Sequence, residues 1–224
     1  MLDKNKICFI TCVTSEMYYE EVLLYLRQLR IPGNMSVEYI SIRNAKSMTS
    51  GYNKAMKQSN AKYKIYLHQD FFLTNKEAIN ELMELFQSDV SIGMIGLAGC
   101  VRLPASGIWW KAEKCLGMLY HSYVPESICQ TIYGQIDNVY SVVQAIDGVF
   151  MATQYDLIWR EDMFLGWHFY DISQSIEFYR AGYKVVLPKQ EKCWGIHATG
   201  EKELGIDYRQ WRNKFLEEYG LEIL

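Results

Sequence analysis

The sequence lacks the short motifs that mark the best-known nucleotide, zinc-protease and serine-hydrolase sites. It has no P-loop, no Gly-x-Gly-x-x-Gly, no His-Glu-x-x-His and no Gly-x-Ser-x-Gly, which argues against the enzyme classes that those motifs define. Its six cysteines are scattered and form no Cys-x-x-Cys pair. We therefore expect a cytoplasmic protein with reduced thiols, rather than a disulfide framework or a zinc site.

A long hydrophobic run and an excess of positive charge are also missing. The most apolar stretch, residues 90–101, has 12 residues and includes three glycines, whereas a membrane-spanning helix needs about 20 apolar residues. The short run Ile7–Val13 has no cleavage site after it, so we interpret it as a buried strand and not as a signal peptide. Because 23 Lys and Arg stand against 26 Asp and Glu, no nucleic-acid partner is expected.

What is present is the composition of a globular protein. The chain has 224 residues, of which 50% are hydrophobic and 22% charged, and this length is sufficient for one large core. Neither repeats nor low-complexity tracts nor linkers divide it. We therefore expect one domain that covers residues 1–224.

Apolar residues in the first part alternate between strand-like runs and helical spacing. The strand-like runs are Ile7–Val13, Val37–Ile42, Ile65–His68 and Ile92–Ala98, and each segment between them carries apolar residues at helical spacing. This order predicts an α/β fold in which helices cover both faces of a mostly parallel sheet. Ligands of such sheets bind beyond the carboxyl ends of the strands, and Asp70 lies at one of those ends.

The second part is less regular. Residues 102–146 are rich in aromatic side chains and have no clear period, so we assign no helix there. Asn138–Ile146 and Val149–Thr153 favour strands that are added antiparallel at the edge of the sheet. A helix is expected to begin at Asp171, and a strand at Tyr183–Leu187 follows it.

Two polar residues follow the third strand and have two interpretations. The alternation of side chains places His68 and Asp70 on one face and Gln69 on the other. One metal ion could contact both residues of the pair. Alternatively, Asp70 begins a turn and His68 is an ordinary histidine at the end of a strand. The residues themselves leave both interpretations open.

Several segments resemble, in order and spacing, the family-2-like glycosyltransferases of the GT-A fold. They are Ser50–Ala55, Tyr66–Asp70, Asp147–Phe150, Phe164–Asp171 and Ala181–Tyr183. The resemblance implies a single-domain GT-A fold of the Rossmann-like type, with a mixed, mostly parallel sheet flanked by helices. It also implies that residues 1–100 form the half that binds a nucleotide-sugar and residues 101–224 the half that binds the acceptor.

The resemblance implies a glycosyltransferase of the hexosyltransferase type. Such an enzyme transfers a sugar from a nucleotide-diphosphate donor, here a UDP-sugar, to a saccharide hydroxyl with inversion, as in polysaccharide biosynthesis. The alternative is a nucleotide-sugar-binding protein without catalysis, because His68 and Tyr170 stand where the family has carboxylates. A nucleotidyltransferase is less favoured, because Thr11–Glu16 contains neither the glycine nor the lysine of a phosphate loop.

The resemblance also implies a site for a divalent cation, Mn²⁺ or Mg²⁺, on the donor diphosphate. Asp70 matches the last carboxylate of the family's Asp-x-Asp motif, and His68 occupies the first position. The cation would therefore lose one carboxylate oxygen and accept an imidazole or a water instead. His197 matches a histidine that related enzymes bring to the metal; the alternative is a surface or core histidine.

Asp171 matches the family's catalytic base, which removes the proton of the acceptor hydroxyl. With Gln174 three residues later, Asp171 also fits a capping box at the start of a helix. The two roles are compatible, because a base must be held within reach of the hydroxyl. On the acceptor side the resemblance implies Asp147. Trp167 could stack on an acceptor sugar, and Trp109 and Trp110 could line the same cleft, although most tryptophans are simply part of the core.

On the donor side the resemblance implies residues at the ends of the first three strands and one residue of a helix. The implied donor-binding residues are Thr11, Thr14, Glu16, Arg43, Asn44, Asn53, His68 and Asp70. Arg43 and Asn44 stand where the family usually has an Asp. Asn53 matches the Asn of the family's Arg-Asn helix, or is a polar residue on a helix surface.

Overall fold

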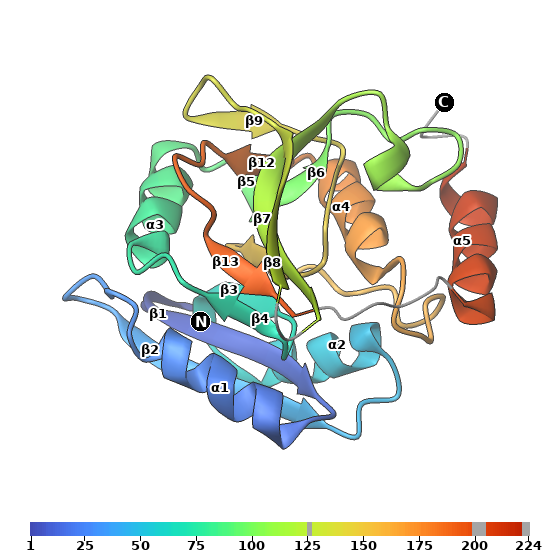
Figure 1. The fold of residues 1–224 in the computed structure, drawn as a ribbon. Helices are drawn as coiled ribbons and strands as arrows, with labels where there is room; N and C mark the ends of the chain where they lie inside the picture. Colours follow the sequence, from blue (N-terminus) through green and yellow to red (C-terminus); the bar gives the residue numbers. More distant parts are fainter. Residues whose placement is uncertain (125–126, 199–204, 221–224) are drawn as a thin grey trace.

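The fold centres on a seven-stranded sheet with strand order β2-β1-β3-β11-β5-β12-β9 in the computed structural model (Figure 1). The structure describes residues 1–124, 127–198 and 205–220. The strands of this sheet are β1 (Asp3–Val13), β2 (Ser36–Arg43), β3 (Ala61–Leu67), β5 (Ile92–Ile95), β9 (Tyr140–Val142), β11 (Phe150–Thr153) and β12 (Lys184–Pro188). The helices are α1 (Glu16–Leu26), α2 (Met48–Gln58), α3 (Ala78–Ser88), α4 (Tyr170–Arg180) and α5 (Ile206–Tyr219), together with a short 3-10 helix, η1 (Trp109–Lys111).

Most strands of this sheet run in the same direction. β1 pairs in parallel with both β2 and β3, and β12 pairs in parallel with β5. Because β11 is antiparallel to both β3 and β5, those two strands share one direction. The predicted α/β fold with a mostly parallel sheet is therefore confirmed. β9, which lies within the expected segment Asn138–Ile146, is an antiparallel edge strand as predicted.

The predicted edge position of Val149–Thr153 is wrong. β11 lies in the middle of the sheet, between β3 and β5. All of its residues are buried, and a strand without a polar face fits the centre of a sheet that is covered on both sides. This placement brings the turn before β11 next to the end of β3, where the amide of His68 donates to the carbonyl of Val149 at 3.1 Å.

Side chains of β1 alternate between two apolar cores, one on each face of the sheet. Ile7 and Phe9 belong to the core that includes Val22 of α1 and the apolar face of α3. Cys8 and Ile10 belong to the core on the opposite face, which includes the apolar face of α2. Helices thus cover both faces, as the sequence predicts.

A second, six-stranded sheet connects the two parts of the chain. Its strands are β4 (Phe71–Leu73), β6 (Ala98–Cys100), β7 (Cys115–Val124), β8 (Ser127–Gly134), β10 (Ala145–Ile146) and β13 (Gly195–His197). The hairpin of β7 and β8, at the front of Figure 1, occupies much of the segment that we left unassigned. β13 lies between β4 and β7, so the last strand among the described residues reaches the turn that follows β3.

The start of α4 differs from the predicted capping box. The helix begins at Tyr170, and its N-cap is Phe169, which has a left-handed φ of 63° and makes no side-chain cap. Such a φ is unfavourable for a bulky residue. Burial of Phe169 against Tyr208 and Phe215 of α5, with ring centroids 5.0 and 5.4 Å away, offsets this cost. Asp171 therefore lies inside the first turn, and its carboxylate is available for other contacts.

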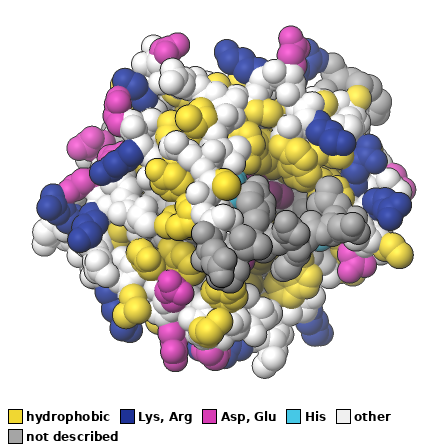
Figure 2. Space-filling view, viewed as in Figure 1, with side chains coloured by type: hydrophobic (Ala, Val, Ile, Leu, Met, Phe, Trp, Pro, Cys, Tyr) yellow, Lys and Arg dark blue, Asp and Glu magenta, His cyan; other side chains and the backbone are white. Residues whose placement is uncertain are grey.

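The surface shown in Figure 2 has most of its charged side chains toward the rim. Hydrophobic side chains gather nearer the middle of this face, where a histidine is visible.

Within residues 1–124, 127–198 and 205–220, no helix combines the length and the apolarity that crossing a bilayer requires.

Candidate active site

The turn after β3 directs neighbouring side chains to opposite sides. Gln69 accepts hydrogen bonds from the backbone amides of Thr14 and Ser15, each at 2.8 Å, and donates to the Thr14 hydroxyl at 2.7 Å. His68 and Asp70 face the end of β13 instead, with Nδ1 and Oδ1 3.8 Å apart. The prediction that Gln69 points away from His68 and Asp70 is confirmed. The cause is a turn at these residues and not the alternation of side chains along a strand.

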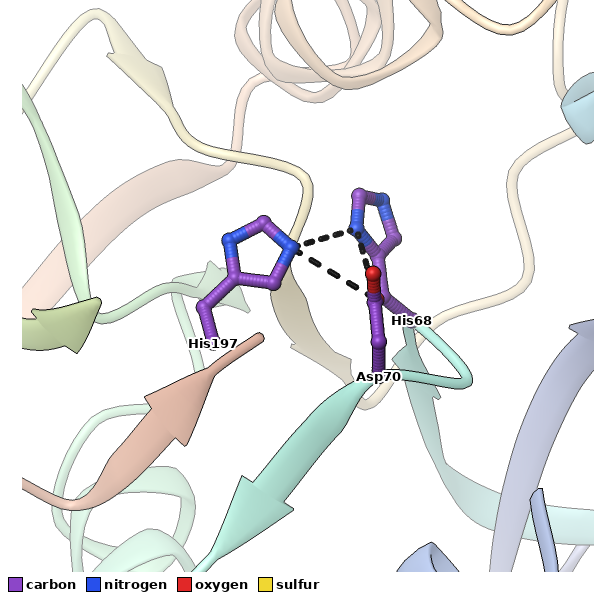
Figure 3. A group of neighbouring side chains, drawn as sticks. All are labelled: His68, Asp70 and His197. Atoms are coloured by element: carbon purple, nitrogen blue, oxygen red, sulfur yellow. Dashed lines mark hydrogen bonds and ion pairs between the residues drawn. The ribbon is translucent and has the colours of Figure 1, made fainter. Parts of the chain in front are cut away.

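His197 completes a group of three potential metal ligands (Figure 3). Its Nε2 lies 3.3 Å from Nδ1 of His68 and 3.5 Å from Oδ1 of Asp70. The backbone holds this arrangement, because the amide of Ala198 donates to the carbonyl of Asp70 at 2.9 Å. The sequence-predicted ligands His68, Asp70 and His197, which come from segments far apart in the chain, therefore lie together.

The spacing and chemistry of this group fit a divalent cation. Its ligand atoms all lie within 4.8 Å of one another. Ligands about 2.1 Å from one ion in octahedral or tetrahedral geometry are about 3.0–3.4 Å apart, and the three distances here are close to that range. Two imidazoles with one carboxylate suit Mn²⁺ better than Mg²⁺, which prefers oxygen ligands.

The histidines also favour a charged Asp70. Burial by itself raises the pKa of this carboxyl group, but the hydrogen bond from His197 and the charges of His68 and His197 outweigh burial and lower the pKa below its ordinary value. Asp70 therefore offers an anionic oxygen for a cation.

Asp171 has a different electrostatic environment. Its Oδ2 accepts a hydrogen bond from the amide of Gly148 at 2.9 Å. Burial, and then the negative charge of Asp147, raise the pKa of the Asp171 carboxyl to about 7, against the lowering effect of backbone amides. A carboxyl group with a pKa near neutrality suits proton transfer.

Asp171 lines the same cleft as the histidines. This cleft has a volume of about 180 Å³, and His68, Asp147 and His197 also line it. Of the two acidic groups that the sequence singled out, Asp171 lines this cleft directly, and Asp70 contacts two histidines that line it. A candidate cation site and a carboxyl group that can accept a proton therefore meet at one cleft.

Aromatic side chains form another part of this cleft. Trp109, Trp110 and Trp167 all line it, and so does Tyr208 of α5. Their exposure differs: Trp109 is 2% exposed and packs in the core, whereas Trp110 is 39% and Trp167 42% exposed. The sequence singled out Trp167 and the pair Trp109 and Trp110 for this cleft, and within the pair Trp110 has the accessible ring.

Most of the predicted donor residues lie at the carboxyl ends of β1 and β2. These strands pair so that Val13 is opposite Arg43. Arg43 forms a two-point ion pair with Glu16, at 2.6 and 2.7 Å, and Asn44 follows in a left-handed turn with a φ of 57°. Thr14 lies in the neighbouring loop, whereas Thr11 is buried within β1 beneath this edge.

Asn53 does not join this group. It is buried, and its amide group exchanges two hydrogen bonds of 2.9 Å with the backbone of Trp159. These bonds tie α2 to the segment that leads toward α4. We therefore assign Asn53 a structural position rather than a contact with a ligand.

Several residues of the site are absent from the sequence-based prediction of binding residues. Gln69 holds the loop after β1, Tyr170 contacts His68 from α4, and Tyr208 reaches the cleft from α5. The only sequence signal for Gln69 is its place between two candidate ligands. Tyr208 has none, because only the packing of α5 against Phe169 brings it there.

Comparison with known proteins relates this chain to a family. Residues 8–219 match the sequence model of a glycosyltransferase like family. A search among curated proteins gives no match.

Solved structures with a similar fold support the same relationship. Staphylococcus aureus TarS, residues 1–349 in complex with UDP, aligns with a TM-score of 0.59 and 11% identity over 98% of this chain and 69% of that chain. The complex of the same protein with UDP-GlcNAc aligns with a TM-score of 0.57 and 10% identity over 89% of this chain and 60% of that one. The mannosyltransferase PcManGT from Pyrobaculum calidifontis, in complex with GDP-Man and Mn²⁺, has a TM-score of 0.55 and 11% identity over 94% and 60% of the two chains. The chain thus spans about 60% of the length of the second and third of these structures, and at such low identity the likeness shows the fold, which is of the GT-A type.

Proposed function

The chain belongs to the glycosyltransferase like family, and from this premise we propose that it transfers a sugar from a nucleoside-diphosphate donor to a hydroxyl group of a saccharide. We propose a UDP-sugar as donor and inversion at the anomeric carbon. The observation that carries this proposal is the shared cleft, which Asp171 lines together with the two histidines that contact Asp70.

Asp171 acts as the general base. An acceptor hydroxyl that enters the cleft donates its proton to the carboxylate of Asp171, and its oxygen forms a bond to the anomeric carbon. The bond from that carbon to the diphosphate oxygen breaks at the same time, and the nucleoside diphosphate leaves with the electron pair. Attack from the side opposite the leaving group inverts the configuration. The hydrogen bond from the amide of Gly148 holds Asp171 in place for this step.

His68, Asp70 and His197 would hold a divalent cation on the donor side. When bound, such a cation stabilises negative charge on the diphosphate as it leaves. The edge formed by Thr14, Glu16, Arg43 and Asn44 supplies polar groups for the nucleoside, since nucleotides bind beyond the carboxyl ends of parallel strands.

The acid limb of the pH–rate profile is expected to lie near pH 7, because the base must be ionised and the pKa of Asp171 is about 7. Besides Asp147, the charge of Asp171 acts on Tyr52, Tyr170 and Tyr208, and the histidines His68, His168 and His197 line the same cleft. Asp147→Asn removes the negative charge that contributes to this raised pKa, so kcat/KM should begin to fall at a lower pH than in the wild type. The shift is partial, because burial is the larger cause.

The control for this measurement is Asp137→Asn, which removes an acidic residue outside the cleft. Its profile should coincide with that of the wild type. If Asp147→Asn leaves the acid limb where it is, or moves it to higher pH, the electrostatic description of Asp171 is wrong.

Trp110 is expected to bind the acceptor through its exposed ring. Trp110→Ala should raise KM for the acceptor about 3- to 10-fold, the size of a typical aromatic contact, with little change in the melting temperature. Trp109→Ala should instead destabilise the protein by about 3–5 kcal/mol, because it leaves a cavity in the core. Equal effects of the two substitutions on KM would contradict this division of roles.

The proposed function is tested first by thermal unfolding with UDP, GDP or CDP, each with and without Mn²⁺. A ligand at about 100 times its dissociation constant adds about 2.7 kcal/mol of stability, so UDP with Mn²⁺ should raise the melting temperature clearly. Release of UDP from UDP-sugars is then measured with saccharide acceptors, and NMR gives the anomeric configuration of the product. If no nucleotide binds, the donor site is wrong. Binding without any turnover favours the alternative, a nucleotide-sugar-binding protein without catalysis. The histidine at position 68 and the tyrosine at position 170, in place of carboxylates, are the reason for considering this alternative.

A further inference from the structure

The buried hydroxyl of Tyr170 joins the helix that carries Asp171 to the turn that carries His68. It forms a short hydrogen bond with Nε2 of His68. Tyr170 is 3% exposed, and its ring packs against the rings of Tyr52 and Trp159, with centroids 5.9 and 6.4 Å away. The hydroxyl is therefore fixed by the core of the protein and not by the ligand.

The neighbouring backbone leaves space for this hydroxyl. A Cβ atom on Gly148 would clash with the Tyr170 oxygen, so the absence of a side chain at position 148 permits the contact with His68. The amide of the same glycine holds Asp171. The turn before β11 thus accommodates two adjacent residues of α4.

The two ring nitrogens of His68 have different surroundings. Nε2 contacts Tyr170, whereas Nδ1 lies 3.3 Å from Nε2 of His197 and 3.8 Å from Oδ1 of Asp70. A metal-bound histidine usually donates its other ring N–H to a fixed acceptor, which sets both the tautomer and the ring orientation. The hydroxyl of Tyr170 lies where such an acceptor is needed.

We propose that Tyr170 is a positioning residue for the cation: its oxygen accepts the hydrogen bond from Nε2–H of His68, so that the unprotonated Nδ1 would be available as a ligand together with Asp70 and His197. This inference rests on the proposed function for the presence of a cation in the site. It makes His68 and Tyr170 a cooperating pair.

Tyr170→Phe removes the acceptor and keeps the ring. Loss of such an outer partner typically weakens metal binding about 10- to 100-fold, and we expect the dissociation constant for Mn²⁺ to rise by that factor. It is measured by electron paramagnetic resonance of free Mn²⁺, without nucleotide or sugar. Thermal unfolding without metal reports any effect on the fold separately.

Tyr52→Phe is the matched control. It removes another buried phenol hydroxyl from the same aromatic cluster, and this hydroxyl has no hydrogen-bond partner among the described residues. The affinity of the Tyr52→Phe variant for Mn²⁺ should equal that of the wild type. A purely structural role of Tyr170 would lower the melting temperature and leave the affinity for Mn²⁺ unchanged, and this result would overturn the proposal.

A second measurement does not depend on a variant. In the wild type with Zn²⁺ bound, nitrogen-15 NMR of the four histidines should show that His68 carries its proton on Nε2; a proton on Nδ1 would overturn the inference, and so would a wild type that binds no metal. If metal binds as expected and Tyr170→Phe weakens it, but no nucleoside diphosphate binds, the positioning role stands and the proposed function fails.

Discussion

Asp171→Asn is expected to reduce kcat for sugar transfer by about 10²- to 10⁴-fold, the usual contribution of a general base. The amide keeps an oxygen that can accept from Gly148, so the side chain keeps its position and loses only the capacity to take a proton. Binding of the donor should therefore change little. Steady-state kinetics with saturating donor measures the loss.

The same substitution should not destabilise the protein above neutral pH. Because the pKa of Asp171 is raised to about 7 in the folded state, whereas an unfolded Asp titrates near 3.9, the wild type loses stability as the pH rises through this window. Asn does not ionise, so at pH 8 the melting temperature of the variant should equal or exceed that of the wild type.

Asp207→Asn is the matched control, since Asp207 is an exposed acidic residue in the first turn of α5. It should leave kcat unchanged. Full activity of Asp171→Asn would remove Asp171 from the mechanism, and a large fall in its melting temperature would mean that the lost activity reflects the fold.

Removal of the cation is the second change with a large expected effect. Charge stabilisation by a bound metal contributes several kcal/mol to such reactions, so chelation by EDTA should lower transfer at least about 100-fold. Mn²⁺ should restore activity better than Mg²⁺, because two of the three ligands are imidazoles. Asp70→Ala should prevent this restoration.

His68→Asp tests the choice of metal more finely. It replaces an imidazole by a carboxylate and should raise activity with Mg²⁺ relative to Mn²⁺. For the removal of the cation, activity that survives both EDTA and Asp70→Ala would show that transfer needs no cation at this site. For His68→Asp, an unchanged ratio of the activities with Mg²⁺ and Mn²⁺ would show that His68 is not a ligand.

Local patterns in the sequence predicted the framework of the site. The strand β1 is a mostly apolar run, and α2 and α3 carry their apolar residues on one face. Asp70 follows a buried strand, which places it at the ligand-binding edge of the sheet. The central position of β11 was not predictable in this way, because burial on both faces shows that a strand is covered but not which strands flank it.

Other parts of the site depend on contacts between distant segments. His197 meets Asp70 only because β13 pairs with β4 in a particular register. The contact between Tyr170 and His68 joins residues 102 positions apart, and no spacing rule encodes it. The exposure of Trp110 rather than Trp109 follows from how η1 packs, and adjacent identical residues give no sign of it. The cytoplasmic location and the division into two binding halves stay predictions.

The most direct measurement is a crystal structure of the protein with UDP and Mn²⁺, in which anomalous scattering locates the metal. We predict an anomalous peak about 2.0–2.3 Å from ligand atoms of His68, Asp70 and His197, with the diphosphate in the cleft that Asp171 lines. Mn²⁺ and UDP bound on a different surface, with the cleft empty, would contradict the proposal that these residues share one catalytic centre.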